Sequence, residues 1–409
     1  MNIAILHYSV PPVVGGVESV IAHHARLMDT NGHSVRLIAG RGEALGEKIP
    51  LVAMPLADSQ HPRVLSVKEQ LDEGTVTTDF DSLRDDLVSQ LQAALTGVDI
   101  LIAHNICSLN KNLAVTAALQ KIQNDAGERK LPCLILWHHD LAWTTPRYLP
   151  ELHDGYPWDL LRTDWGGALH VVVSELRRRE LADLMKLEPD SVRVIPNGVD
   201  AARFYKLEAQ TQNFLDQTGI LDAAPILLLP VRVTRRKNIE LALHTVAELQ
   251  KHFPQAALVV TGPLGPHNAR NHEYFDTLLQ LRRQLGLEGS VHFLAELADS
   301  FLPDEVIADF YRIADALIFP SREEGFGIPL IEAAFSRLPV FCADIPPLRE
   351  LGLNDAHFFS PDEDPARLAE LIADHFRSSA PARLAMRTRS TFLWGAIYQQ
   401  HIAPLLSRE

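Results

Sequence analysis

The stretch ALIFPSREEGFGIPLIEAAF, residues 316–335, decides the fold because it contains one complete strand–turn–helix unit. Its four apolar residues Ala316–Phe319 predict a strand that is covered on both faces, as in a parallel sheet. Two glycines open the turn that follows, and Pro329 stands where the first turn of a helix tolerates proline. The apolar run Ile328–Phe335 then predicts a helix.

Similar units recur along the whole chain, with short apolar runs alternating with longer runs of helical period. The predicted strands are Ile3–Leu6, Val35–Ala39, Ile100–Ala103, Leu134–Trp137, Val171–Ser174 and Val192–Ile195, followed by Ile226–Val231, Leu258–Thr261, Val291–Leu294, Ala316–Phe319 and Val340–Ala343. The predicted helices include Val17–Asn31, Ser82–Leu95, Leu109–Asp125, Glu175–Lys186, Ile239–His252 and Tyr274–Leu285. Such alternation predicts an α/β protein with doubly wound parallel sheets.

More than ten strands are too many for one sheet, so we expect two Rossmann-like domains that face each other across a cleft. The turn-rich segment 196–200 marks the break, giving domains over residues 1–200 and 201–385. Residues 386–409 read as a C-terminal helix that packs back on the first domain. Ligands of doubly wound sheets bind at the carboxyl ends of the strands, which would place a ligand in the cleft.

The composition limits the classes of function. The 409 residues carry 52 acids against 38 bases, a formal charge of −14, which disfavours nucleic acid or an anionic bilayer as a broad partner. Three scattered cysteines, Cys107, Cys133 and Cys342, indicate a reducing compartment and give no disulfide framework or metal knuckle. The sequence shows no signal peptide and no membrane-spanning apolar run, so we expect a cytoplasmic protein.

Paired glycines, Gly15 and Gly16, follow the first predicted strand and precede a helix. Without a Cβ they allow a ligand to approach the backbone closely, and the helix N-terminus offers N–H groups to a phosphate. A simple tight turn is the alternative explanation.

A basic cluster follows the predicted strand Ile226–Val231. It consists of Arg232, Arg235, Arg236 and Lys237. Four cations at the ligand end of a strand favour binding of a diphosphate through charge-assisted hydrogen bonds over a solvated loop.

Two glutamates accompany the stretch quoted above. Glu324 lies in the glycine-containing loop, and Glu332 interrupts an otherwise apolar helix. A carboxylate there must face water, a partner or a ligand, because burial without a partner is costly. Both could accept hydrogen bonds from sugar hydroxyls in one cleft, although a helix-start acid favoured by the dipole also explains Glu332.

Taken together, these segments resemble the retaining family-4 glycosyltransferases, which have the GT-B fold. The setting of Glu324 and Glu332 resembles that family's E-G-F-G-x-P-x-x-E signature, and Arg232 with Lys237 resembles its diphosphate clamp. Gly15-Gly16-x-Glu18 resembles its N-terminal glycine loop, and the P-N-G-V-D segment at 196–200 resembles its interdomain segment. The motifs occur in the family's order.

The resemblance implies a role for each matching residue. Arg232 and Lys237 would bind the donor diphosphate, Glu332 the ribose hydroxyls and Glu324 the donor sugar. His139, with His138 as the alternative one position earlier, would lie against that sugar. The remaining donor-site residues implied are Gly15, Gly16, Gly262, Gly325, Phe326, Gly327 and Ile328. Of the whole set, His139, Glu324, Arg232 and Lys237 would serve catalysis.

The implied reaction transfers a sugar from a UDP- or GDP-linked donor to an unknown hydroxyl acceptor with retention, without a metal and without any further cofactor. The first domain would hold the acceptor and the second the nucleotide sugar. Acceptor-side candidates after the strand ends are His104, Asn105, Asn110, Asn112 and Trp143. The oligomeric state and peripheral contact with lipid acceptors stay open.

Other interpretations are weighed against this one. Asp79-Phe80-Asp81 spells the D-x-D metal signature of another transferase fold, but its place before a helix favours ordinary caps. Arg177, Arg178 and Arg179 are expected to form a solvated helix face. A nucleotide-sugar epimerase, a phosphorylase or a two-lobed sugar-binding protein remain alternatives.

Overall fold

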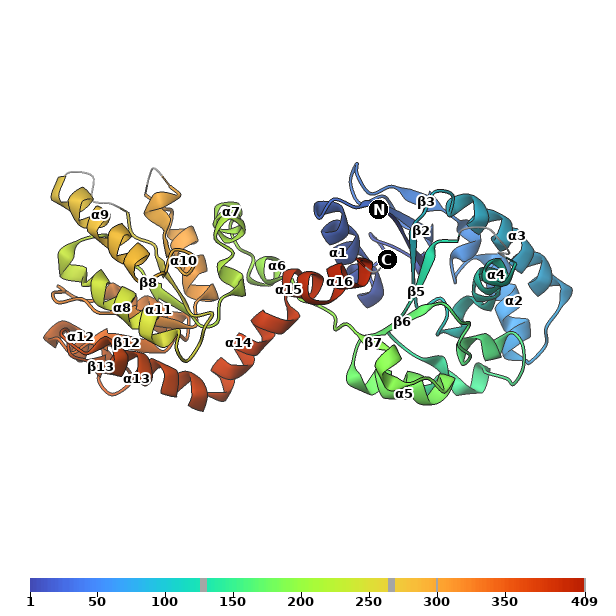
Figure 1. Ribbon diagram of the computed structural model, residues 1–409. Coiled ribbons are helices and arrows are strands. Elements are labelled where there is room, and N and C mark those ends of the chain that lie inside the picture. The colour runs from blue at the N-terminus through green and yellow to red at the C-terminus, as the bar shows by residue number, and fades with distance from the viewer. Residues whose placement is uncertain (126–130, 264–268, 299–300, 408–409) are drawn as a thin grey trace. The chain divides into compact units, whose positions relative to one another are not determined.

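The structure, a computed structural model, describes residues 1–125, 131–263, 269–298 and 301–407. The chain divides into two compact units, each with its own parallel sheet (Figure 1). Unit 1 comprises Met1–Gly198 and Ile397–Glu409, and unit 2 comprises Val199–Ala396.

Unit 1 contains a seven-stranded parallel sheet in the order β3-β2-β1-β4-β5-β6-β7. The strands are β1 Asn2–Ser9, β2 Ser34–Arg41, β3 Leu51–Ala53, β4 Ile100–His104, β5 Cys133–His138, β6 Leu169–Val172 and β7 Arg193–Val194. The helices are α1 Gly16–Thr30, α2 Pro62–Asp72, α3 Thr78–Ala94, α4 Leu113–Asn124 and α5 Glu175–Met185, with short 3-10 helices η1 Pro55–Ala57, η2 Asn110–Asn112, η3 Ala142–Thr144, η4 Leu149–Glu151, η5 Trp158–Leu161 and η6 Pro189–Ser191.

Unit 2 contains a six-stranded parallel sheet in the order β10-β9-β8-β11-β12-β13. The strands are β8 Ile226–Leu229, β9 Ala257–Val260, β10 Val291–Phe293, β11 Ala316–Phe319, β12 Val340–Ala343 and β13 His357–Phe359. The helices are α6 Ala201–Tyr205, α7 Ala209–Thr218, α8 Ile239–Leu249, α9 Ala269–Gln284, α10 Asp304–Ile313, α11 Ile328–Phe335, α12 Pro346–Gly352, α13 Pro365–Ser378 and α14 Ala380–Phe392, with 3-10 helices η7 Ile220–Asp222, η8 Arg235–Lys237 and η9 Leu294–Glu296.

Both sheets run outward in two directions from a central pair of strands, β1 and β4 in unit 1 and β8 and β11 in unit 2. The crevice at the carboxyl ends of such a central pair is where doubly wound sheets bind ligands. The central strands are buried on both faces: β8 and β11 are buried at every position, as continuous apolar runs require. The topology therefore directs attention to the loops that follow these four strands.

The C-terminal helices are divided between the units. α14 stays with unit 2, because Arg389 forms an ion pair with the buried Asp315 and donates to the carbonyl of Ala223 over 2.8 Å. The segment from Ile397 onward belongs to unit 1, whereas the prediction began the tail at residue 386.

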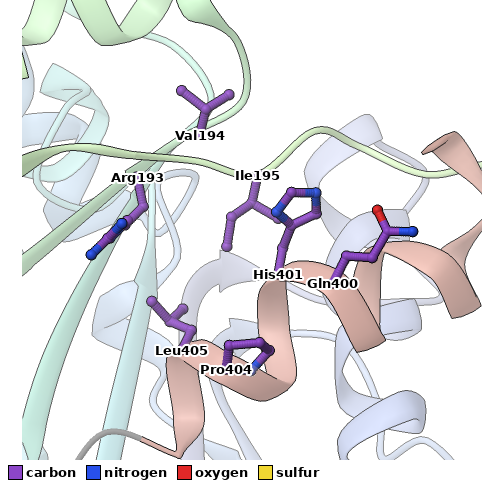
Figure 2. Close-up of a pocket in the computed structure, with 7 residues that line it drawn as sticks. All are labelled: Arg193, Val194, Ile195, Gln400, His401, Pro404 and Leu405. Atoms are coloured by element: carbon purple, nitrogen blue, oxygen red, sulfur yellow. The ribbon is translucent and has the colours of Figure 1, made fainter. Parts of the chain in front are cut away.

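The tail itself consists of α15 Trp394–Ile397, a π-helical turn η10 Tyr398–Ile402 and α16 Ala403–Leu406. Within unit 1, Gln400, His401, Pro404 and Leu405 line a small pocket of about 140 Å³ together with residues 193–195 at β7 (Figure 2). Ile402 and Leu406 are buried, so apolar packing holds the tail in this unit.

The predicted α/β class with two Rossmann-like parallel sheets is confirmed, and all eleven predicted strands are present. Two further strands, β3 and β13, escaped prediction. Each has only three residues at a sheet edge and is only partly buried. Within the described residues, no helix has an apolar run long enough to cross a membrane.

Candidate functional site

Three loops follow neighbouring strands of the unit 2 sheet at their carboxyl ends. They are residues 230–238 after β8, 261–263 after β9 and 320–327 after β11. Gly262 allows the first two loops to touch, because a Cβ at this position would lie 1.8 Å from the carbonyl oxygen of Val231. Backbone cannot give way as a flexible side chain can, so this position requires glycine.

Lys237 and Glu324 meet where the loops after β8 and β11 come together. The Nζ of Lys237 donates a hydrogen bond to Oε1 of Glu324 over 2.5 Å, and both side chains are buried. Asn238 fixes the two loops in place: it has a left-handed backbone, and its Nδ2 donates to the carbonyls of Pro320 and Pro361 at 3.1 and 2.8 Å. Two predicted site residues that are 87 positions apart in the chain thus form one ion pair.

The charge around Glu324 is positive on balance. Arg236 approaches Oε2 of Glu324 at 3.6 Å and donates to the carbonyl of Glu323 over 2.9 Å. One carboxylate therefore stands against two cations. Burial lowers the pKa of Lys237, and the hydrogen bond to Glu324 opposes that shift. An anion that reached this place would find cations already held in position.

Arg232 differs from Lys237 although both were predicted as clamp residues. Its side chain is exposed and lies 6.0 Å from the ring centroid of Phe301. No ion pair holds Arg232 within the part of the chain that the structure describes. Of the two predicted clamp residues, Lys237 is thus buried and paired, whereas Arg232 is exposed.

Glu332 lies on α11 and is exposed, as its isolated place in an apolar run suggested. The hydroxyl of Tyr311 donates to its Oε2 over 2.6 Å. Tyr311 is itself buried on α10, and burial together with this hydrogen bond raises its pKa. Sequence reasoning missed Tyr311, whose only signal was a lone tyrosine near the end of a helix, and it orients the carboxylate without any ligand.

The glycine loop before α11 combines packing and exposure. Gly327 has a φ of +109°, and a Cβ there would lie 2.5 Å from Cδ2 of Leu348, so this glycine is structural. Gly325 has open space around it. Phe326 and Ile328 expose 55% and 58% of their surface, which is unusual for large apolar side chains and leaves the loop open to a ligand.

The paired glycines of unit 1 lie at the start of α1, after β1. The space beside Gly15 is already occupied, since a Cβ there would lie 2.0 Å from Oε2 of Glu18. Gly16 is exposed and has no neighbour within 4 Å of an added Cβ. The expected close approach of a ligand therefore suits Gly16, whereas Gly15 makes room for a side chain of the same motif.

His138, the last residue of β5, and the adjacent His139 point in different directions. Nε2 of His138 lies 3.0 Å from Nδ1 of His170 in β6, while Nε2 of His139 lies 3.0 Å from Nδ1 of His104 in β4. Both are buried, and burial lowers the pKa of His139 to about 3. His139 is the one of the two beside β4, the central strand of the sheet, and it is neutral near pH 7.

Asn105 positions the loop that carries His139. It has a left-handed backbone, and its Oδ1 accepts hydrogen bonds from the backbone N–H of His139 at 2.8 Å and of Asp140 at 3.3 Å. Its buried side-chain oxygen is thus used within the protein, and contact of Asn105 with an acceptor stays a prediction.

The other acceptor-side candidates are also engaged. Asn110 donates to Glu151 over 2.8 Å, and Asn112 caps α4 by accepting from the N–H of Val115. The indole of Trp143 donates to the carbonyl of Trp158. His104 is fully buried against His139. These side chains thus contact other protein groups, and their role toward an acceptor stays a prediction.

The predictions for the aspartates at 79 and 81 and for the arginines at 177–179 both concern surface side chains. Asp79 and Asp81 lie in the first turn of α3 on either side of the buried Phe80, and Asp81 pairs with Arg84 over 2.6 Å. Arg177 is not simply solvated: it pairs with Glu180 at 2.6 Å and reaches Asp140, next to His139, at 3.4 Å. It therefore links α5 to the histidine loop.

Two family models together match most of the chain. Residues 14–203 match the sequence model described as Glycosyltransferase Family 4, and residues 210–391 match that described as Glycosyl transferases group 1. The chain is 26% identical over 377 residues to mannosylglucosylglycerate synthase of Petrotoga mobilis, covering 85% of this chain and 83% of that protein.

A second relative, D-inositol 3-phosphate glycosyltransferase of Kineococcus radiotolerans, is 32% identical over 244 residues, 55% of this chain and 54% of its own length. Among solved structures, Anabaena HepE in complex with UDP and glucose aligns over 100% of both chains at 20% identity with a TM-score of 0.37, too low to support a conclusion about the fold.

Proposed function

Because the chain belongs to the family 4 (group 1) glycosyltransferases, retaining enzymes of the GT-B fold that use nucleotide sugars, we propose that unit 2 binds a UDP- or GDP-linked sugar and that the enzyme transfers this sugar to a hydroxyl acceptor. The donor diphosphate lies against Lys237 and Arg232. Glu332 binds the ribose, and Glu324 lies beside the donor sugar.

The ion pair between Lys237 and Glu324 at the central strands β8 and β11 carries this proposal. Breaking the anomeric C–O bond leaves negative charge on the departing diphosphate, and a cation already fixed by its neighbours stabilises that charge without reorganisation. Arg232 supplies a second, exposed cation on the same loop, able to move onto a phosphate when the donor arrives.

Glu332 suits a pair of ribose hydroxyls. Its carboxylate is exposed, yet the hydroxyl of Tyr311 holds one oxygen at 2.6 Å. A carboxylate that is oriented before binding loses less conformational entropy when two hydroxyls donate to it. A flexible surface glutamate would lose more conformational entropy on binding.

His139 is proposed as the histidine that contacts the donor sugar. Asn105 fixes its backbone and His104 its ring, so its orientation is set before any substrate binds. Because burial lowers its pKa, His139 acts as a neutral hydrogen-bonding group and not as a cation.

The acceptor class is proposed from the relatives. The two named above are a mannosylglucosylglycerate synthase and a D-inositol 3-phosphate glycosyltransferase, so small anionic polyols are the acceptors to test first. An assay of UDP or GDP release with a panel of nucleotide sugars, with and without glucosylglycerate or D-inositol 3-phosphate, tests the proposal.

We expect one nucleotide sugar to release its nucleotide faster with an acceptor than without. Arg232→Ala should slow that release at subsaturating donor, whereas Arg367→Ala, which removes another exposed arginine of unit 2, should not. Equal release by the two variants would refute the role of Arg232. Binding of free sugars without any nucleotide binding would favour a sugar-binding protein instead.

A further inference from the structure

A second polar cluster lies at the carboxyl end of β1 in unit 1, beside the central strand β4. It consists of His7, Ser9 and Glu18, of which the first two are in β1 and the third in the first turn of α1. His7 and Ser9 are buried, and the side chain of Glu18 is 14% exposed. None of the three takes part in the donor site proposed above.

The hydrogen bonds of His7 determine which ring nitrogen carries the proton. Nδ1 lies 2.7 Å from the carbonyl oxygen of His104, and because a carbonyl only accepts, Nδ1 carries the hydrogen. Nε2 of the neutral ring is then a bare acceptor. Burial lowers the pKa of His7 to about 4 although nearby Glu18 raises it, so the ring is neutral near pH 7.

The bare nitrogen of His7 faces another acceptor. Nε2 lies 4.0 Å from Oε1 of Glu18, which is too far for a hydrogen bond, and Oε1 already accepts from the hydroxyl of Ser9 at 2.7 Å. Within the described ranges, no lysine or arginine pairs with Glu18. Two acceptors thus face each other with no proton between them, an arrangement that only a donor from outside the protein completes.

The position of Glu18 is not explained by the helix alone. A first-turn glutamate is stabilised by the helix dipole wherever its side chain points. Here the carboxylate folds back over Gly15, whose missing Cβ leaves the room, and turns toward β1. The missing side chain of Gly15 and the position of Glu18 thus act together to direct the carboxylate toward His7.

We propose that His7, Ser9 and Glu18 form a subsite for a ligand with adjacent hydroxyl groups, one donating to Nε2 of His7 and its neighbour to Glu18. Sugars and polyols carry such hydroxyl pairs, whereas a phosphate would bring a second negative charge against the carboxylate of Glu18. If the ligand is a substrate of the transfer reaction, this inference rests on the proposed function. The hydroxyls then belong to the acceptor or to the donor sugar.

Nitrogen NMR of the histidine rings in the full chain tests the subsite, with His7 assigned by its loss in His7→Gln. We expect one protonated nitrogen, Nδ1, and a bare Nε2 at pH 7. Added myo-inositol, glycerol or glucose should shift Nε2, since a hydroxyl then donates to it. A doubly protonated ring, or no shift with any of these polyols or with nucleotide sugars, would overturn the proposal.

Glu18→Gln provides the matching variant. Its amide keeps an oxygen for Ser9 and can donate its own N–H to His7, which fills the subsite from within and preserves the fold. Polyol affinity should fall about tenfold or more. Glu175→Gln, another first-turn glutamate of unit 1, controls for the helix dipole and should leave affinity unchanged. Equal affinities of the two variants would contradict the assignment.

The source of the hydroxyls follows from the same titrations. A shift caused by a free polyol assigns the subsite to the acceptor, and a shift that requires the intact nucleotide sugar assigns it to the donor sugar. A thermal-shift titration with UDP and GDP runs separately and tests the proposed function. A polyol-induced shift without nucleotide binding would keep the subsite and reject the transferase.

Discussion

A double-mutant cycle on Lys237 and Glu324 separates the structural role of this pair from its role toward the donor. Lys237→Met removes the cation and leaves a buried carboxylate, Glu324→Gln does the reverse, and the double variant removes both charges. Breaking a buried ion pair by removing one partner costs about 3–5 kcal/mol. Since Arg236 still lies 3.6 Å from Glu324 and each buried group keeps some contact with water, we expect about 2–3 kcal/mol for each single variant.

The double variant should cost less than the sum of the single variants, by about 2 kcal/mol, because neither charge is then left alone. Urea unfolding of the four proteins measures this coupling. Additive losses would show that the 2.5 Å contact contributes no coupling and would refute the account of the pair.

The affinity for UDP or GDP should fall in Lys237→Met and should not fall in Glu324→Gln. Lys237→Met removes a charged partner of the diphosphate, worth about 1.5–3 kcal/mol, so UDP or GDP should bind roughly 10- to 100-fold more weakly. Glu324→Gln releases Lys237 from its internal partner, so UDP or GDP without a sugar should bind at least as tightly as to the parent. Calorimetric titration measures both. Weaker binding of the sugar-free nucleotide to Glu324→Gln would contradict this reasoning.

Three further predictions concern other parts of the molecule. Gly262→Ala should cost at least about 1–3 kcal/mol of unfolding free energy because its Cβ meets the backbone of Val231, whereas Gly325→Ala, in open space, should be nearly neutral; urea unfolding of both variants decides. Asn105→Ala should reduce kcat more than donor affinity, since it frees the loop of His139; unchanged kcat would argue against a positioning role. Burial lowers the pKa values of His7, His24 and His139 to about 4, 3 and 3. Below pH 6.5 these histidines therefore bind protons in the unfolded state but stay neutral in the folded state. The free energy of unfolding should then fall by up to about 1.4 kcal/mol per pH unit for each histidine until pH 3–4. Urea titrations at pH 7.5 and 5 followed by tryptophan fluorescence, which reports mainly on unit 1, measure this slope; equal stability at both values would contradict it.

The sheets could be predicted from the sequence because their strands are continuously apolar. Most of the eleven predicted strands follow this pattern, and the loops after β1, β8 and β11 carry the residues that the motifs single out. The edge strands β3 and β13 have only three residues each, and their pairing depends on the neighbouring strand that is already in place.

The contacts within the site could be predicted only in part. The sequence places Lys237 and Glu324 after two strands, but their contact depends on the strand order and on Asn238, whose left-handed backbone has no sequence signature of its own. Tyr311 and His7 become visible only when separate elements are brought together. Spacing alone also does not show that Asn110 donates to Glu151 or that Asn112 caps α4.

The central claim is that cations on the loop after β8 hold the donor diphosphate. A crystal structure of the protein with UDP or GDP tests it most directly. We expect phosphate oxygens within about 3.2 Å of Nζ of Lys237 and of the Arg232 guanidinium. A nucleotide bound elsewhere, with Lys237 still engaged by Glu324 alone, would contradict the claim.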